Sequence, residues 1–505
     1  MRRAEPGTGR RRALLRAALA VLTVTVVALP FAAARQYDAF RRTVAQQAAP
    51  PGSGAAGTDA KAAPARGAPV VLAYHDVAPD RRSRYTVSPK DFDAQLRALR
   101  EAGYRTLSTR EFTDFLRTGR TPAPRTVYLT FDDGTHGLWV HADPLLARYG
   151  MKAAAYLITG QVGTHRPYYL SWAEAERMAG SGRWDFQAHT HLSHERAPAD
   201  AAGHERSAFT NRLWRPDEGR VETGEEYRRR IAADLDRSVG DLTGHGLPRP
   251  ELFAYPFSER LEESNLGRDG ADALRSMLRA RFTATLTNSS ARPLPPGRRA
   301  AAAGQVQRLE VTRDTTAAGL LRAMARWAPV APSDADRPLS HPGHWRMTGE
   351  PDGAGPGTLT GATRPAPGTE YVSAAYRPLA TADWTAYRLR ALVDGLRATS
   401  NSAGVTLREG SGHPVALSVG RNTASLTGGG PRGTGESCRL APAARHTVTV
   451  SVTSERVRLT VDGDACATVR AAARPAPELA GGFSLSLRNG GPQRQWPRFT
   501  SLEVE

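Results

Sequence analysis

Cysteine is almost absent from this 505-residue chain, which contains only Cys438 and Cys466. Two thiols this late in the chain are too few to form a metal site that organises the fold. In an oxidising compartment we expect them to pair in a disulfide, because thiols exposed to such conditions seldom stay free.

Lysine is also scarce, so arginine supplies most of the excess of 18 positive charges. Beyond the N-terminus these arginines are scattered, and no basic segment is interleaved with aromatic residues as single-strand binding requires. Nucleic acid is therefore not an expected partner. The 40% of hydrophobic and 23% of charged residues instead fit a soluble globular protein with two or three domains.

A long apolar run, residues 17–34, follows a cluster of arginines near the N-terminus. Positive charge before an apolar segment predicts export of the chain on its C-terminal side. The run is long enough to anchor the chain in the cell membrane, while the small residues at 32–34 would allow cleavage and secretion. We predict a signal or anchor segment over 1–42 and a flexible Ala/Pro/Gly-rich tether over 43–69, with the rest of the protein outside the cytoplasm.

Between residues 70 and 334, short apolar runs alternate with amphipathic helical patterns. Such alternation predicts a parallel sheet covered by helices, here a distorted (β/α)7 barrel of the α/β class. The expected strands are 70–77, 126–131, 152–158, 185–189, 251–257, 282–287 and 306–311. The expected helices are 89–102, 109–118, 141–149, 172–180, 224–242, 271–280 and 316–327.

The pattern changes after residue 334. Proline and glycine are dense over 335–368, which predicts a linker, and short alternating strands with turn residues come next, over 369–505. We expect an all-β sandwich there, similar to concanavalin-like jelly rolls and stapled by the two cysteines. A carbohydrate-binding role and a structural role for this domain remain open.

Two segments of the predicted barrel carry metal-binding side chains. Asp132 and Asp133 follow an apolar strand, and His189, His191 and His194 lie within six residues after another. One carboxylate and two imidazoles form a full set of protein ligands for a catalytic divalent metal with an open position. A second carboxylate beside the metal could then take a proton from water, which predicts metal-assisted hydrolysis.

The same residues come at the ends of their predicted strands, as does His75. In parallel barrels the active site lies where strands end and loops begin. These side chains are therefore expected to converge on one face of the barrel, although they are far apart in the sequence.

The segment Thr130-Phe131-Asp132-Asp133-Gly134 resembles the first signature of the NodB-homology polysaccharide deacetylases, carbohydrate esterase family four. The resemblance implies that Asp132 is the general base and Asp133 a metal ligand. The form His-Thr-His-x-x-His resembles the branch that deacetylates poly-β-1,6-N-acetylglucosamine in biofilms, and it implies that His189 and His194 bind the metal. His191 is then an outer or exposed residue.

In that branch, whose order is circularly permuted, the acid histidine precedes the aspartate pair, as does the segment Leu72-Ala73-Tyr74-His75 here. The resemblance implies that His75 protonates the leaving amine.

Residues 253–258 resemble the third signature, which lines the substrate groove. It implies that Tyr255, Pro256 and Phe257 contact the glycan and that the backbone N–H of Tyr255 stabilises the oxyanion. The arginine often found in this signature is Ala254 here, which leaves open how Asp132 is held. Trp184 is expected to stack on a sugar ring, as is Tyr169, although either could also belong to the core.

Together these features predict a metal-dependent hydrolase that removes N-acetyl groups from an extracellular or cell-wall polysaccharide. Zinc is the expected metal for an Asp-His-His set, with nickel, cobalt or iron as alternatives. An O-acetyl esterase and an inactive glycan-binding barrel are the alternative functions. An iron oxygenase uses a similar ligand set but leaves the second aspartate and His75 unexplained.

Overall fold

The structure is a computed structural model, which describes residues 68–505 except 81–82, 121–122, 259–260, 262–263, 290–292, 348–355, 367, 429–434, 472–475 and 491–495. The predicted N-terminal segment and nearly all of the predicted tether lie outside these residues. Within the described part of the chain, no helix is both long enough and apolar enough to cross a membrane.

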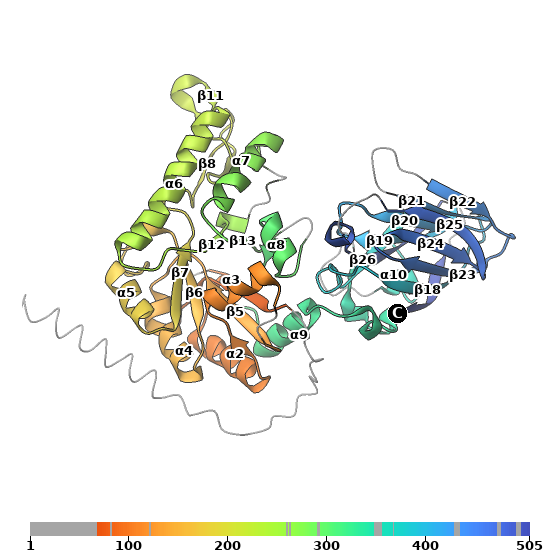
Figure 1. Ribbon diagram of the computed structural model, residues 1–505, viewed down its shortest axis with the longest axis horizontal. Helices are drawn as coiled ribbons and strands as arrows, with labels where there is room; N and C mark the ends of the chain where they lie inside the picture. The colour runs from red at the N-terminus through yellow and green to blue at the C-terminus, as the bar shows by residue number, and fades with distance from the viewer. Residues whose placement is uncertain are drawn as a thin grey trace, which may run out of the picture.

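The first half of the described chain forms a parallel sheet with helices packed around it (Figure 1). The sheet order is β14-β13-β12-β7-β6-β5-β1-β15, with the short strand β4 paired to β5. Apart from the two-residue strand β4, its members correspond to the strands expected from the sequence, so the predicted barrel is confirmed. They are β1 (Val70–Tyr74), β4 (Arg105–Thr106), β5 (Thr126–Phe131), β6 (Ala153–Leu157), β7 (Trp184–Ala188), β12 (Leu252–Ala254), β13 (Ala284–Thr287), β14 (Val306–Gln307) and β15 (Leu309–Glu310).

One residue, Arg308, joins the two edges of this sheet. It lies between β14, which pairs with β13, and β15, which pairs with β1. The Arg308 N–H donates to Thr287 O at 2.9 Å, and the Val311 N–H donates to Ala73 O at 2.9 Å. The chain thus passes directly from one edge of the sheet to the other, which brings the barrel almost to closure.

The helices of the barrel lie close to their expected bounds, and serine or threonine caps begin several of them. Capping boxes form at Ser108 with Glu111, and at Thr223 with Glu226. The helices are α2 (Pro89–Glu101), α3 (Thr109–Thr118), α4 (Asp143–Tyr149), α5 (Trp172–Gly180), α6 (Gly224–Gly244), α7 (Gly267–Arg279), α8 (Arg298–Ala303) and α9 (Ala317–Trp327). The short helix α8 was not expected, and it has no side-chain cap that would signal its start.

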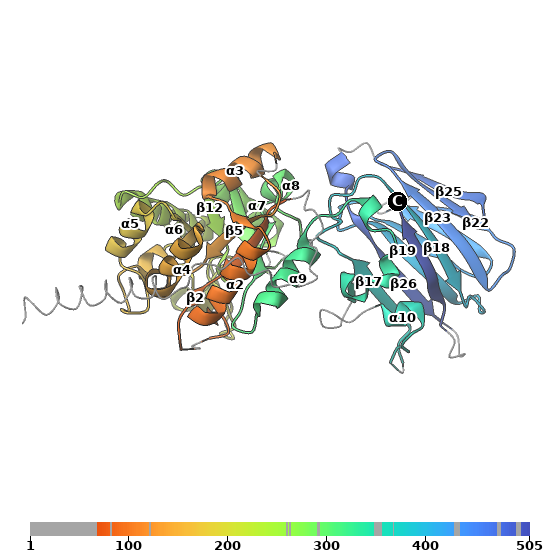
Figure 2. The ribbon, with the colours of Figure 1, turned by 90° about the horizontal axis from the view of Figure 1, so that it is seen from below.

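The second half of the chain forms two antiparallel sheets, as expected for the all-β region (Figure 2). One sheet has the order β16-β17-β26-β19-β20-β21-β22 and the other the order β25-β24-β23-β18-β27. Their inner faces share one apolar core. The strands are β16 (Trp345–Met347), β17 (Tyr371–Tyr376), β18 (Tyr387–Asp394), β19 (Asn401–Glu409), β20 (Val415–Val419), β21 (Thr423–Gly428), β22 (Gly435–Arg439), β23 (Arg445–Val452), β24 (Arg456–Val461), β25 (Asp464–Arg470), β26 (Gly482–Asn489) and β27 (Arg498–Val504).

Two features of this region differ from the sequence-based expectation. Strand β16 lies inside the predicted linker, yet it pairs with β17 and buries Trp345 in the shared core. Strands β21, β22 and β25 were not predicted, because their polar and small residues give weak apolar alternation. A disulfide between Cys438 on β22 and Cys466 on β25 joins the end strands of the two sheets.

Candidate metal centre and active site

Asp133, His189 and His194 meet at the carboxyl ends of β5 and β7. Their ligand atoms all lie within 4.8 Å of one another. The Oδ1 atom of Asp133 is 3.5 Å from the Nε2 atom of His189 and 3.5 Å from that of His194. The structure thus brings together the three residues expected to bind a metal.

The backbone fixes which ring nitrogen of His189 faces the cluster. The Nδ1 atom lies 2.8 Å from the carbonyl oxygen of Ala254 at the end of β12, and it acts as the donor because a carbonyl only accepts. The Nε2 atom then carries the lone pair of the ring, and it faces the cluster, 3.5 Å from Asp133 Oδ1. Such a second hydrogen bond is the usual way in which a metal-binding histidine is oriented.

Asp234 on α6 holds the loop that carries His194. Its carboxylate accepts three backbone hydrogen bonds, from the N–H groups of His191 at 3.0 Å, Leu192 at 2.8 Å and Ser193 at 2.9 Å. The ring of His191 points away from the cluster, since its Nδ1 atom lies 2.9 Å from Asp241. The expectation that His191 is not a ligand agrees with this placement.

The donor set fits a divalent metal. The Oδ1 atom of Asp133 is buried and has no hydrogen-bond partner among the described residues, which is costly for a carboxylate unless a cation satisfies it. Burial and the nearby His189 lower the pKa of His194 to about 4, so its ring is neutral at neutral pH, as a metal ligand must be. Asp133 itself has φ of +70°, in the left-handed region that residues other than glycine seldom adopt.

Asp132 is held by a buried arginine. The guanidinium of Arg308 donates two parallel hydrogen bonds to the Asp132 carboxylate, at 2.7 and 2.6 Å. Both side chains are almost fully buried. Burial raises the pKa of Asp132, but the charges of Arg308, His189 and His75 together with the hydrogen bonds from Arg308 hold the pKa below its usual value.

Arg308 therefore does for Asp132 what the absent arginine of the third signature was expected to do. Its own orientation is fixed by Asn288, which accepts from Nε at 2.8 Å, and by Thr130 Oγ1 at 3.2 Å. Sequence analysis missed this residue because one more arginine in an arginine-rich chain carries no signal. Only closure of the barrel brings it next to Asp132.

His75 lies beside Asp132 at the end of β1. Its Nε2 atom is 4.0 Å from Asp132 Oδ2, and its ring packs on Tyr85 with 4.5 Å between the ring centroids. The Nδ1 atom is buried without a hydrogen-bond partner among the described residues. His75 thus lies in the same side-chain cluster as the aspartate pair.

The expected oxyanion role of the Tyr255 backbone is wrong. The Tyr255 N–H donates to the carbonyl oxygen of Leu286 at 3.0 Å, which continues the pairing of β12 with β13. The Tyr255 ring is buried and packs against Phe253. Phe257 instead faces the metal cluster, since its ring centroid lies 4.5 Å from that of His194.

Trp184 is also not a sugar-stacking residue. It is 3% exposed, its ring packs on Phe131, and its Nε1–H donates to Asp143 at 3.0 Å. Trp184 occupies the first position of β7 and packs between the sheet and α4, away from the strand end where the site is built.

The surface beside the metal cluster is apolar and exposed. Phe257 is 42% exposed, Leu192 is 53% exposed and Tyr168 is 39% exposed, and they account for three of the four exposed large hydrophobic residues in the described part of the chain. Tyr168 packs edge-on against Tyr169, whose pKa is raised by burial and by the charge of Asp133. These residues form a rim around the site.

Part of the barrel matches the model of a known protein family. Residues 119–270, which include the aspartate pair and the histidine segment, match the polysaccharide deacetylase family model. Over 206 residues the chain is 28% identical to the poly-β-1,6-N-acetyl-D-glucosamine N-deacetylase of Escherichia coli K12, covering 38% of this chain and 30% of that protein. Over 176 residues it is 33% identical to the enzyme of the same name from Staphylococcus aureus MRSA252, covering 34% of this chain and 54% of that protein.

The chain thus spans between 30% and 54% of the length of these relatives. Among solved structures, IcaB from Ammonifex degensii is 28% identical, with a TM-score of 0.40 over 51% of this chain and 97% of that one. The family match over residues 119–270 identifies this part of the barrel as a polysaccharide deacetylase domain, and the resemblance drawn from the sequence is confirmed.

Proposed function

We propose that this protein is a metal-dependent N-deacetylase of a polysaccharide built from N-acetylglucosamine. The observation that carries the proposal is the pairing of two carboxylates with different surroundings. Asp133 presents an unpartnered oxygen to two imidazoles, while Asp132 is held ionised by Arg308. One carboxylate is thereby suited to hold a cation and the other to accept a proton.

Asp133, His189 and His194 would hold the metal, and an Asp-His-His set favours zinc over nickel, cobalt or iron. A divalent metal in this position polarises an amide carbonyl and lowers the pKa of water. The residues around it would move the protons and stabilise the oxyanion.

Asp132 accepts the proton of the attacking water. A base works in its ionised form, and the two hydrogen bonds from Arg308 favour that form. They also fix the carboxylate in one orientation, so that it can reach the water without reorganising.

His75 gives a proton to the leaving amine. Its Nε2 atom lies 4.0 Å from Asp132 Oδ2, which is close enough for acid and base to act on one scissile bond between them. Proton loss at one side and proton gain at the other would complete the cleavage, with acetate and a free amine as products.

The backbone N–H of Phe257 replaces that of Tyr255 as the donor to the oxyanion. In the segment Tyr255–Ser258, the Tyr255 N–H bonds to Leu286 O, proline has no N–H, and the Ser258 N–H bonds to Tyr255 O. Phe257 is thus the remaining donor, and its φ of +55° turns the chain sharply beside His194.

The substrate is a glycan, because an apolar rim around a polar catalytic centre suits the carbon faces of pyranose rings. Tyr168, Leu192 and Phe257 would pack on the sugars that flank the reacting unit. The names of the relatives support a β-1,6-linked N-acetylglucosamine chain. The N-terminal apolar run supports action outside the cytoplasm, as a secreted or membrane-anchored enzyme.

The proposal is tested by measuring acetate release from β-1,6- and β-1,4-linked N-acetylglucosamine oligomers. The protein is assayed after chelation and again after zinc, nickel, cobalt or iron is restored. We expect release only with metal, and faster release from the β-1,6 oligomer.

An O-acetylated glycan without N-acetyl groups serves as the control for esterase activity. Release from that ester alone would contradict the N-deacetylase assignment. No release from any substrate by metal-loaded protein would favour a glycan-binding barrel without activity.

A further inference from the structure

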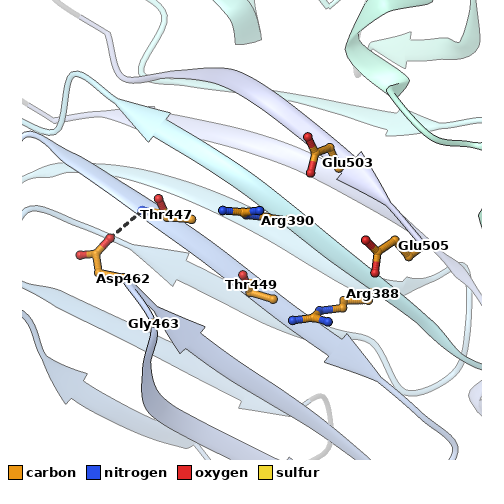
Figure 3. Close-up of a pocket in the computed structure, with 8 residues that line it drawn as sticks. All are labelled: Arg388, Arg390, Thr447, Thr449, Asp462, Gly463, Glu503 and Glu505. Carbon is orange, nitrogen blue, oxygen red and sulfur yellow. Dashed lines mark hydrogen bonds between the residues drawn. The ribbon is translucent and has the colours of Figure 1, made fainter.

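The C-terminal sandwich has a hollow on the outer face of its five-stranded sheet. Its volume is about 570 Å³, within the range of ligand sites. Figure 3 shows the residues around it, which come from β18, β23, β27 and the turn after β24. The lining residues are Arg388, Arg390, Thr447, Thr449, Asp462, Gly463, Glu503 and Glu505.

Strand register aligns these side chains in rows across the sheet. Arg390 on β18, which lies between β23 and β27, pairs with Glu503 on one side and with Thr449 on the other. Arg388 exchanges backbone hydrogen bonds with Glu505 in the next row. Because side chains alternate along a strand, all of them project from the outer face while Leu389 and Ala391 enter the core.

The four charged side chains of these rows have no polar side-chain partner among the described residues. Arg388, Arg390, Glu503 and Glu505 are exposed, and none makes an ion pair or a side-chain hydrogen bond with another described residue. Opposite charges on neighbouring strands would ordinarily pair. The rows therefore leave two guanidinium groups and two carboxylates free to face a ligand, beside the hydroxyl groups of the threonines.

Asp462, at the edge of the hollow, is fixed by contacts with residues of β23. Asp462 accepts a hydrogen bond from the Thr447 N–H at 2.7 Å and contacts the Nδ1 atom of the buried His446 at 2.6 Å. Gly463, in the tight turn with φ of +99°, carries no side chain that could fill the space. Hydrogen bonds within the protein therefore fix the edge of the hollow.

We propose that this hollow binds a neutral glycan chain. A guanidinium only donates hydrogen bonds and a carboxylate only accepts them, whereas each sugar hydroxyl does both. The two arginines and the two glutamates balance in charge, and Asp462 adds one carboxylate that is already hydrogen-bonded within the protein, so neither a polyanion nor a polycation would meet lining charges of one sign. No aromatic residue lines the hollow, so binding depends on hydrogen bonds and gains strength from the repeated units of a polymer.

This inference extends the proposed function, because the same polymer would be held by the sandwich and deacetylated by the barrel. The sandwich would keep the enzyme on its substrate between turnovers. Binding at the hollow does not require the barrel to be active, so the two claims can fail separately.

The test measures binding of the full chain to immobilised β-1,6- and β-1,4-linked N-acetylglucosamine hexamers, with chelator present to prevent turnover. The variant is Arg390→Gln combined with Glu503→Gln, which removes one charge of each sign and leaves the net charge unchanged. Loss of charge-assisted hydrogen bonds should weaken binding at least about tenfold. The matched control, Arg439→Gln combined with Glu370→Gln, changes exposed residues outside the hollow and should bind like the original protein.

Equal binding by variant and control would overturn the inference, as would absence of binding by all forms. Tighter binding of polygalacturonate than of the neutral hexamers would overturn it too, by showing that the face is a site for acidic polymers. Acetate release from a short soluble oligomer, measured on the same proteins with metal, reports separately on the barrel and should not change.

Discussion

At the scale of single residues, the pair of aspartates shows how neighbouring positions acquire different chemistry. Asp132 and Asp133 are adjacent, but the turn sends one carboxylate toward Arg308 and the other toward the histidines. Sequence alone predicts that the two differ, since successive side chains alternate in direction. It does not predict which group neutralises Asp132, because that group lies 176 positions away.

Replacing Arg308 should move the acid limb of the pH–rate profile. Asp132 acts as a base only when ionised, so activity falls as the pH drops through its pKa. Burial raises that pKa and Arg308 lowers it, so Arg308→Ala should raise the pKa and cause loss of kcat/KM at higher pH than in the original protein. The unpaired carboxylate should also cost roughly 3–5 kcal/mol of stability.

Arg308→Lys is the informative companion, because it keeps a positive charge while losing the two parallel hydrogen bonds. We expect an acid limb between those of the original protein and of Arg308→Ala. An unchanged acid limb in both variants would show that Arg308 does not control the ionisation of Asp132.

Replacing His75 should slow the chemical step without loss of metal. His75→Gln removes the proton donor, and a general acid contributes roughly 10²–10⁴-fold to the rate. We expect a fall in kcat of that size, with bound metal, measured by elemental analysis, as in the original protein. Loss of metal together with activity would contradict the role given to His75.

At the scale of elements, strand ends position the site and one helix braces it. The predicted strands were recovered from apolar runs and the helices from their caps, because both signals are local. The bracing contacts of Asp234 could not be predicted, since they join α6 to a loop about 40 positions earlier and depend on the helix packing beside β7. In a sequence, an acidic residue on the polar face of a helix ordinarily predicts only a side chain in contact with water, so Asp234 gave no sign of a bracing role.

Asp234→Asn should loosen the loop that carries His194. Removal of a residue that orients a metal ligand typically weakens metal affinity about 10–100-fold. We expect a change of this order in zinc dissociation, followed with a chromogenic chelator. Asp236→Asn is the control, because Asp236 lies on the same helix but pairs with Arg281 at the surface, and it should leave metal affinity unchanged.

At the scale of the whole molecule, the barrel and the sandwich each have an apolar core of their own. Specific contacts join them: Trp384 Nε1–H donates to Val330 O at 2.6 Å, and Arg299 donates to Ala382 O at 2.7 Å. The density of proline and glycine predicts a linker before the sandwich. It does not reveal β16, whose Trp345 and Met347 are buried in the core of the sandwich.

Reducing the disulfide should weaken the sandwich but not the barrel. The bond closes a loop with a sequence separation of 28, for which the loss of chain entropy corresponds to roughly 3–4 kcal/mol. We expect a reductant, or the pair Cys438→Ser and Cys466→Ser, to lower the unfolding transition of the C-terminal half in calorimetry. Acetate release should persist, and its loss would show that the barrel depends on an intact sandwich.

The most direct test of the central claim compares Asp132→Asn with Asp133→Asn, measuring bound metal and acetate release on the same samples. The two substitutions are chemically identical and lie at adjacent positions. We predict that Asp132→Asn retains the metal but loses activity, whereas Asp133→Asn loses both. Retention of activity by Asp132→Asn, or an equal loss of metal in the two variants, would contradict the division of base and ligand on which this account of the site depends.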